Sequence, residues 1–296
     1  MLPLRKQPGT AVSGLALQHL YSWRFRASLP PPLHAGSLRD FLLAENRSMT
    51  DMPFRGYAFI IGAMKCGTTT LHTLLEQHPA ITVSQEKEPN FFKKAGETCA
   101  EDYEKIFPEL DKTRHVWTLD GSTSYSKTKR WPNPPKRIAE LPGEKRIIYL
   151  MRDPVARIES HIAHSIARGR WQKNYDVKLL KDASSYAQQI AAYETAGLLN
   201  DMMLIDFDEL CREPIAMATR VFEFLGLDIP DIVPVPPQNT RRTQQRFMPE
   251  EDATRWRKRL NQEMRTLVEK YGFEAEWTRP YLEDAPQPKR PRRKPR

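Results

Sequence analysis

The chain has 296 residues, of which 40% are hydrophobic and 28% charged, a composition that suits one generous α/β domain or two small ones. No stretch approaches the roughly 18 uninterrupted apolar residues of a membrane-spanning helix, so none is expected. Cys66, Cys99 and Cys211 are far apart and form no CxxC pair, which argues against a disulfide scaffold or a structural zinc site. We therefore expect a cytoplasmic protein without a metal site.

The net charge of +9 is concentrated in two tails. Residues 1–39 carry five basic groups and residues 285–296 carry six, and neither segment has an acidic group. The sequence between them is close to neutral, so the high isoelectric point says little about what an active site binds. We expect no nucleic-acid partner.

The composition divides the chain into three parts. We expect an N-terminal extension outside the core (residues 1–50), one folded domain (residues 51–280) and a basic disordered tail (residues 281–296). The extension is rich in arginine and poor in acid, which resembles an organelle transit peptide, but a docking arm or sequence upstream of a start at Met49 or Met52 is equally open. For the tail, an electrostatic anchor to a membrane or nucleic acid is the alternative.

Within the domain, short apolar runs alternate with helical patterns. Tyr57–Gly62 (YAFIIG) is typical of a buried strand, and a helix with leucines on one face follows it. Arg146–Met151 (RIIYLM) is a second buried strand, and Pro154, favourable at a first helical position, begins the next helix. The inward positions of that helix are Val155, Ile158, Ile162 and Ile166.

Met202–Phe207 (MMLIDF) is a third predicted strand, followed by a helix that ends at Gly226. The core positions of that helix are Ile215, Ala218, Val221, Phe222 and Leu225. A last long helix carries Trp256, Leu260, Met264, Leu267 and Tyr271. Alternating strands and helices predict an α/β fold, a single P-loop-like domain with a central, mostly parallel sheet flanked by helices.

The segment Gly62–Thr70 (GAMKCGTTT) lies between the first strand and its helix. A glycine-containing turn that opens a helix offers backbone N–H groups and a positive dipole end, which together bind phosphate. A nucleotide-kinase P-loop has lysine directly after its second glycine, whereas Thr68 follows Gly67 here and the lysine lies inside the loop, at Lys65. Threonine is a mediocre helix former, so three threonines favour a phosphate site over a plain turn.

The sequence IIGAMKCGTTTL resembles the 5′-phosphosulfate loop of the sulfotransferases that use 3′-phosphoadenosine 5′-phosphosulfate (PAPS). The resemblance implies that PAPS is the cofactor and that the loop holds its 5′-phosphosulfate. It also implies a catalytic role for Lys65, which would neutralise charge on the leaving phosphate oxygen. The implied cofactor-binding positions of the loop are Lys65, Cys66, Gly67, Thr68, Thr69 and Thr70.

A segment further along the chain supports the same resemblance. IIYLMRDPVARIESHI is similar to the family's 3′-phosphate site, which implies that Arg152 and Ser160 bind that phosphate. A planar cation and a hydroxyl suit a dianion. An ion pair of Arg152 with Asp153 is the alternative. Family members close a late basic loop over the 3′-phosphate, so Arg241 or Arg242 would serve here, although a solvated charge run fits equally well.

The sequence QEKEPNFF resembles the glutamate-and-aromatics segment of the glycan-modifying branch of the family, the branch this chain matches best. The resemblance implies that Glu88 is the base that takes the proton of the acceptor. The alternative is a charged surface turn before a helix whose core residues are Phe91 and Phe92. A histidine base is a further option, because His161 and His164 lie on the polar face of the second predicted helix.

Asp120–Tyr125 (DGSTSY) resembles the segment that lines the family's acceptor cleft, but Gly121 stands where many carbohydrate sulfotransferases have a lysine. We therefore expect no second catalytic lysine at that position. The resemblance covers residues 55–277 and implies in-line transfer of a sulfuryl group from PAPS to a hydroxyl or amine. The expected acceptor is a carbohydrate or glycolipid, with another small molecule still open. The alternatives are a P-loop nucleotide-dependent kinase and an inactive protein that binds PAPS or its product PAP.

Overall fold

The computed structural model describes residues 54–169, 177–236 and 247–283. Strands within these residues form one sheet in the order β2-β3-β1-β4-β5. The strands are β1 (Gly56–Gly62), β2 (Ile81–Val83), β3 (Trp117–Asp120), β4 (Glu144–Met151) and β5 (Met202–Asp206). Every neighbouring pair is parallel, which confirms the predicted α/β architecture and its parallel sheet.

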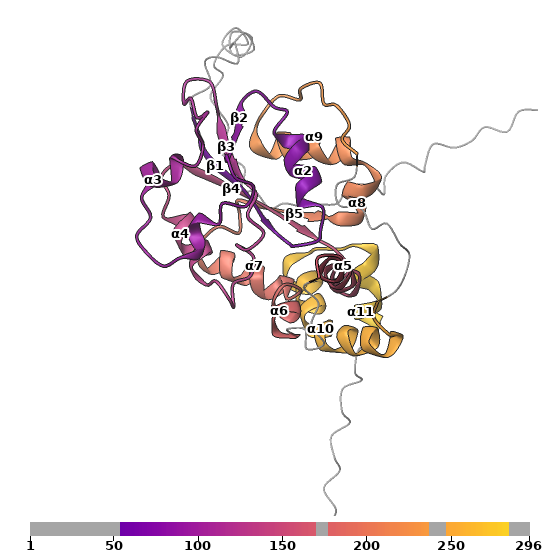
Figure 1. Ribbon diagram of the computed structural model, residues 1–296. Helices are drawn as coiled ribbons and strands as arrows, with labels where there is room; N and C mark the ends of the chain where they lie inside the picture. Colours follow the sequence, from indigo (N-terminus) through magenta and orange to yellow (C-terminus); the bar gives the residue numbers. More distant parts are fainter. Residues whose placement is uncertain (1–53, 170–176, 237–246, 284–296) are drawn as a thin grey trace, which may run out of the picture. The chain divides into compact units, whose positions relative to one another are not determined.

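Helices cover both faces of the sheet (Figure 1). On one face lie α2 (Thr68–Leu75), α8 (Phe207–Arg212) and α9 (Pro214–Leu225). On the other lie α3 (Ala100–Glu104), α4 (Asn133–Ala139) and α7 (Tyr186–Thr195). The remaining helical segments are η2 (Phe91–Lys93), α5 (Pro154–Ala167), α6 (Val177–Asp182), α10 (Glu250–Tyr271), η3 (Glu276–Thr278) and α11 (Arg279–Glu283). The long helix α10 packs against α5, α7 and α11.

Most of the predicted core positions are buried, while Ile215 and Tyr271 are half-buried and Ile166 is exposed. β1 is buried along its whole length, as expected for a strand between two helical layers. On α5, Val155, Ile158 and Ile162 are buried in a cluster with residues of α6 and α10. Ile166, predicted to face inward, is 40% exposed, because it lies one turn beyond the end of that cluster.

The third predicted strand ends one residue earlier than expected. β5 stops at Asp206, whose carboxylate accepts a hydrogen bond from the amide of Asp208 at 3.1 Å and so caps the unpredicted helix α8. Phe207 is therefore the first residue of a helix rather than the last of a strand.

None of the described helices is long and apolar enough to cross a membrane. The thiols of Cys66, Cys99 and Cys211 are all free. The cytoplasmic location stays a prediction.

Candidate active site

The predicted site segments leave the sheet at one edge. Lys65 follows β1, Glu88 follows β2, Arg152 follows β4, and the acceptor segment begins at Asp120, the last residue of β3. Because the strands are parallel and adjacent, their carboxyl ends meet where ligands bind in open α/β sheets. The fold therefore brings together segments that are far apart in the sequence.

The loop after β1 ends at a glycine for two physical reasons. Gly67 has a φ of 78°, in the left-handed region, and caps the start of α2. A Cβ at this position would lie 3.0 Å from Leu210 Cδ2 and 3.1 Å from Phe207 Cδ2, so a side chain here would press against α8. The amides of the first turn of α2, at Thr68 and Thr69, have no carbonyl one turn earlier to accept from them. They are placed to bind an anion.

Cys66 is the buried residue of the loop. Its amide donates to the Ala63 carbonyl at 3.2 Å, and its side chain is fully buried. Burial raises the pKa of the Cys66 thiol to about 12, so the thiol is neutral at physiological pH. A direct contact of Cys66 with the cofactor stays a prediction.

Lys65 lies in a cluster of cations. Burial lowers the pKa of Lys65, and the charges of Arg168 and Arg152 lower it further. Lys87 adds a smaller contribution and donates a hydrogen bond to the Thr69 hydroxyl at the start of α2. Like charges held this closely repel one another, and a bound anion relieves that repulsion. The cluster therefore fits a ligand with several negative charges.

Arg152 does not form the ion pair with Asp153 that the sequence left open. Asp153 instead caps α5 by accepting from the Ala156 amide at 2.9 Å and also accepts from the Tyr281 hydroxyl at 2.8 Å. The Arg152 guanidinium stacks 4.4 Å from the centre of the Phe207 ring, and among the residues described it forms no ion pair. Its charge is therefore available to a ligand.

The other predicted contacts to the 3′-phosphate stay predictions. Ser160 lies half-buried on α5. Arg241 and Arg242 fall outside the described residues.

Glu88 is half-buried rather than exposed on a surface turn. Its carboxylate accepts from the Thr123 hydroxyl, whose oxygen lies 3.2 Å from each carboxylate oxygen. Behind it, Phe92 is fully buried and Phe91 half-buried. Glu88 lies in the connection between β2 and α3. Arg137 of α4 holds this connection by donating to the carbonyls of Phe91, Lys94 and Glu97 at 2.7 to 3.3 Å.

Lys65 and Glu88 share an uncommon backbone conformation. Within the described parts of the chain, the non-glycine residues with positive φ are Lys65 (72°), Glu88 (60°) and Asn90 (57°). This conformation costs an L-residue roughly 1 to 2 kcal/mol, and such residues concentrate at functional sites. Two of the three are the residues to which the family resemblance gives the chemistry.

Lys127 is a candidate that the sequence did not reveal. Its ammonium lies 3.8 Å from Met64 Sδ, next to Lys65 in the loop. Burial lowers the pKa of Lys127, while the negative charge of Glu88 opposes that shift. Lys127 is therefore a half-buried cation between the loop and the candidate base. At Gly121, where many carbohydrate sulfotransferases have a lysine, a Cβ would lie 2.9 Å from His72 Cδ2, so a side chain there would require His72 to shift.

His161 is a weaker candidate for the base. Burial and the charges of Arg157, Lys127 and Lys65 lower its pKa to about 4. A histidine with that pKa is neutral at pH 7 but binds a proton poorly, because burial and the neighbouring cations disfavour its charged form. The assignment of the base to Glu88 stays a prediction.

A buried carboxylate joins the acceptor segment to the Glu88 segment. Asp120 accepts from the hydroxyls of Ser122 at 2.6 Å, Tyr125 at 2.8 Å and Tyr103 at 3.3 Å. The Ser122 oxygen also accepts from the Asn90 amide at 3.0 Å. Burial raises the pKa of Asp120 to about 6, although the three hydroxyls favour the charged form.

Asp120 predicts a pH dependence of stability. The pKa of Asp120 is about 6 in the folded state, above its value in the unfolded chain, so the folded state is stabilised by holding the proton at low pH. This contribution to the free energy of unfolding is lost as the pH rises from about 4 to about 6, and the free energy does not change further through Asp120 at higher pH. In Asp120→Asn this loss is absent, so the stability of the variant relative to the wild type should grow by roughly 2 kcal/mol between pH 4 and pH 7. Urea unfolding at both pH values measures the difference. An unchanged difference would mean that the hydroxyls fully offset burial.

Comparisons with known proteins agree with this geometry. A family model described as "Sulfotransferase domain" matches residues 56–275. Human heparan sulfate glucosamine 3-O-sulfotransferase 3B1 is 24% identical over 187 residues, which cover 57% of this chain and 46% of that protein. Human heparan sulfate glucosamine 3-O-sulfotransferase 6 is also 24% identical, over 186 residues, or 57% of this chain and 52% of that protein. The match thus spans about half the length of these curated relatives.

The fold is similar to that of a solved sulfotransferase. The crystal structure of a sulfotransferase from Alicyclobacillus acidocaldarius has a TM-score of 0.60 and 20% identity, covering 76% of this chain and 99% of that one. The family match extends over most of the domain and includes the segments that follow β1, β2, β3 and β4. The predicted membership is thereby confirmed: this chain belongs to the sulfotransferase family.

Proposed function

We propose that this protein transfers a sulfuryl group from PAPS to a hydroxyl or amine of a carbohydrate acceptor. The observation that carries the proposal is the placement of Lys65 and Glu88 at one edge of the sheet, joined through Lys127. The Lys127 ammonium contacts Met64 of the loop, and the charge of Glu88 acts on its pKa. In the proposal, Lys65 is the leaving-group cation and Glu88 is the base.

The residues present fit PAPS. The nucleotide carries negative charge at both its 5′-phosphosulfate and its 3′-phosphate, and the positive charges of Arg168, Arg152 and Lys87 all act on Lys65. Lys65 and the first turn of α2 would hold the phosphosulfate, and Arg152 with Ser160 would hold the 3′-phosphate. Bound PAPS supplies an activated sulfuryl group attached to a phosphate that leaves readily.

Each side chain of the site has a distinct role in the proposal. Glu88 takes the proton of the acceptor hydroxyl or amine while the Thr123 hydroxyl holds its carboxylate in place. Lys65 places its positive charge where negative charge develops on the leaving oxygen. Lys127 lies between them and limits the repulsion between the Glu88 carboxylate and an anionic ligand. Positioning and charge stabilisation supply most of the catalysis, as in phosphoryl transfer.

The carbohydrate acceptor is supported by two relatives whose names specify glucosamine in heparan sulfate. It is also supported by the glutamate base, which the resemblance associates with the glycan-modifying branch. A PAPS-binding protein without transfer activity is the alternative, and it would bind PAP but transfer no labelled sulfate to any acceptor.

Binding of PAP tests the cofactor assignment. We expect calorimetric titration to show PAP binding without Mg²⁺, at least tenfold tighter than AMP, because AMP lacks the 3′-phosphate. In Arg152→Ala the affinity for PAP should fall at least tenfold, since one charged hydrogen-bond donor is worth roughly 1.5 to 3 kcal/mol. The affinity for AMP should change little.

Arg146→Ala provides the matched control. Arg146 lies on the same strand, β4, but its guanidinium pairs with Asp201 at 2.9 Å at the opposite end of the sheet. Binding of ATP with Mg²⁺ but not of PAP would overturn the cofactor assignment.

A further inference from the structure

The segment formed by η3 and α11, residues 276–283, contacts two of the strand ends that carry the candidate site. Its side chains Trp277 and Tyr281 are buried in the hydrophobic core. The segment is anchored on α10, where the Asn261 side-chain amide donates to the Tyr281 carbonyl at 3.0 Å. Each of the two aromatic side chains carries one polar hydrogen, so each needs an acceptor.

The acceptors are two aspartates that cap helices of the site. The Tyr281 hydroxyl donates to Asp153 Oδ1 at 2.8 Å, and Asp153 caps α5, the helix after β4. The Trp277 indole N–H donates to Asp206 Oδ1 at 2.9 Å, and Asp206 caps α8, the helix after β5. The segment therefore holds the carboxylates at the ends of two neighbouring strands.

Both carboxylates lie within electrostatic reach of Arg152. Partial burial raises the pKa of Asp208 in the first turn of α8, and the charges of Asp206 and Asp153 raise it further. The charge of Arg152 lowers the same pKa, so these charged groups share one region of the structure. A carboxylate near an arginine ordinarily forms charged hydrogen bonds with the guanidinium.

Arg152 nevertheless forms no ion pair among the residues that the structure describes, although Asp153 follows it directly in the chain. Its guanidinium stacks on the Phe207 ring instead. The Asp153 carboxylate already has a donor on each oxygen: the Tyr281 hydroxyl on Oδ1, and the Ala156 amide on Oδ2 at 2.9 Å. Hydrogen bonds to a charged group are strong enough to fix its direction. The bond from Tyr281 thus explains why the adjacent arginine and aspartate stay apart.

We propose that Tyr281 is a positioning residue of the 3′-phosphate site. Its hydroxyl holds the Asp153 carboxylate away from Arg152, so that the guanidinium stays available to the nucleotide. Without that hydroxyl, the carboxylate turns toward Arg152 and competes with the 3′-phosphate for the same donors. The inference rests on the proposed function, in which Arg152 binds this phosphate.

Tyr281→Phe tests the inference, because it removes one hydroxyl and keeps the buried ring. We expect calorimetric titration to show PAP binding about fivefold weaker than in the wild type, the size of effect that a partly exposed ion pair exerts. AMP lacks the 3′-phosphate, so its affinity should stay within roughly 1.5-fold of the wild-type value. A structural defect would weaken both nucleotides alike. That outcome, or an unchanged affinity for PAP, would overturn the inference.

A second substitution tests the role of Asp153. Asparagine still caps a helix but carries no charge to pair with an arginine. Affinity for PAP in the double variant Tyr281→Phe/Asp153→Asn should therefore equal that of Asp153→Asn alone. If the loss caused by Tyr281→Phe persisted without the Asp153 charge, this carboxylate would not be the competitor and the inference would fail.

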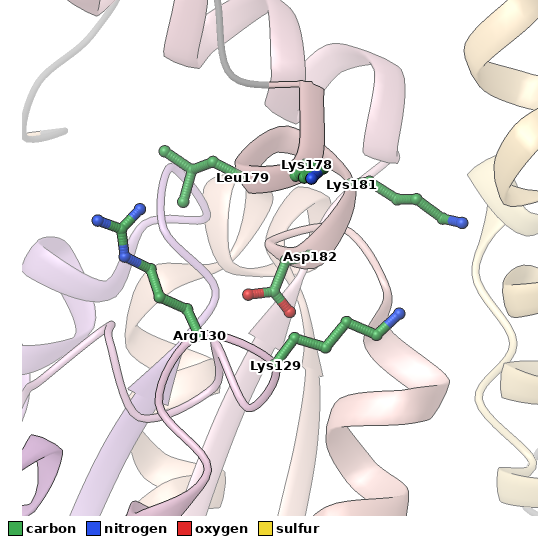
Figure 2. A pocket seen from close by; sticks show the side chains of 6 residues that line it. All are labelled: Lys129, Arg130, Lys178, Leu179, Lys181 and Asp182. Carbon is green, nitrogen blue, oxygen red and sulfur yellow. The ribbon is translucent and has the colours of Figure 1, made fainter.

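Two matched controls accompany these variants. Tyr271→Phe removes another hydroxyl that donates to a carboxylate, Glu194 at 2.9 Å, and should leave both affinities unchanged. Asp182→Asn removes a carboxylate that lies on α6 between the side chains of Lys129 and Arg130 (Figure 2). Added to Tyr281→Phe, it should not restore PAP binding. A loss of PAP affinity in the first control, or rescue by the second, would show that the effect is not specific to the pair of Tyr281 and Asp153.

The inference and the proposed function fail in different ways. If the wild type binds PAP and Tyr281→Phe binds it equally well, the positioning role is wrong and the proposed function stands. If the wild type does not bind PAP, the proposed function falls, and the Arg152 Nε–H resonance, assigned by its loss in Arg152→Lys, still tests the contact. It should shift in Tyr281→Phe and, in the double variant, match Asp153→Asn. An unshifted resonance would show that Asp153 stays away from Arg152 without Tyr281.

Discussion

Lys65→Ala is expected to lower kcat by roughly a hundredfold to a thousandfold, the loss typical of removing a group that stabilises charge only in the transition state. Affinity for PAP should fall by less than tenfold, because Arg152, Arg168 and Lys87 still surround the nucleotide. Transfer of labelled sulfate from PAPS to a carbohydrate acceptor measures the first quantity, and calorimetry measures the second. A large loss of binding with kcat unchanged would make Lys65 a binding residue only.

The backbone at this position allows a second, sharper variant. Lys65 has a φ of 72°, which glycine adopts without strain, so Lys65→Gly should unfold at the same temperature as the wild type or a higher one. It should nevertheless be as inactive as Lys65→Ala. A stable and fully active Lys65→Gly would show that the loop needs the left-handed backbone and not the ammonium.

Glu88→Gln is expected to lower kcat by about a hundredfold to ten-thousandfold while PAP affinity stays within threefold. The amide keeps the shape of the side chain and its contact with Thr123 but cannot accept the acceptor's proton. Single-turnover transfer with excess enzyme measures the chemical step without product release.

The exposed neighbour Glu86 gives the matched control, since Glu86→Gln removes the same charge two residues away and should keep full activity. If Glu88→Gln retained most of its rate, the base would lie elsewhere. His161→Gln would then be the next variant to measure, because His161 lies within electrostatic reach of Lys65 and Lys127.

The sequence predicted the strands that have long apolar runs and missed the short ones. β1, β4 and β5 have five to eight residues and are flanked by clear helix signals, so their identity followed from pattern alone. β2 has three residues and β3 has four, too few for a period to be recognised. Both are fixed by pairing: β3 forms hydrogen bonds with β1 and β2, a tertiary contact that a local pattern does not encode.

Residues of the proposed site could be named from the sequence where a contiguous segment has a recognisable pattern. Lys65 was named because the loop, its glycine and its threonines are contiguous, and Glu88 because a family pattern marks it, and both roles stay predictions. Lys127 and Lys87 were not named, since each belongs to an ordinary charged stretch. Lys127 contacts the loop only when the turn after β3 folds against it, and Lys87 contacts Thr69 only when the connection after β2 folds against α2.

The strand order has a consequence for the synthesis of the protein. β1, which carries the loop, is the first strand of the sheet to be made, yet its neighbours β3 and β4 come from residues 117–120 and 144–151. These pairings join residues far apart in sequence, and such contacts form slowly because a long chain must first close on itself. On the ribosome, the loop therefore lacks one or both of the strands that flank β1 until β4 has emerged from the exit tunnel.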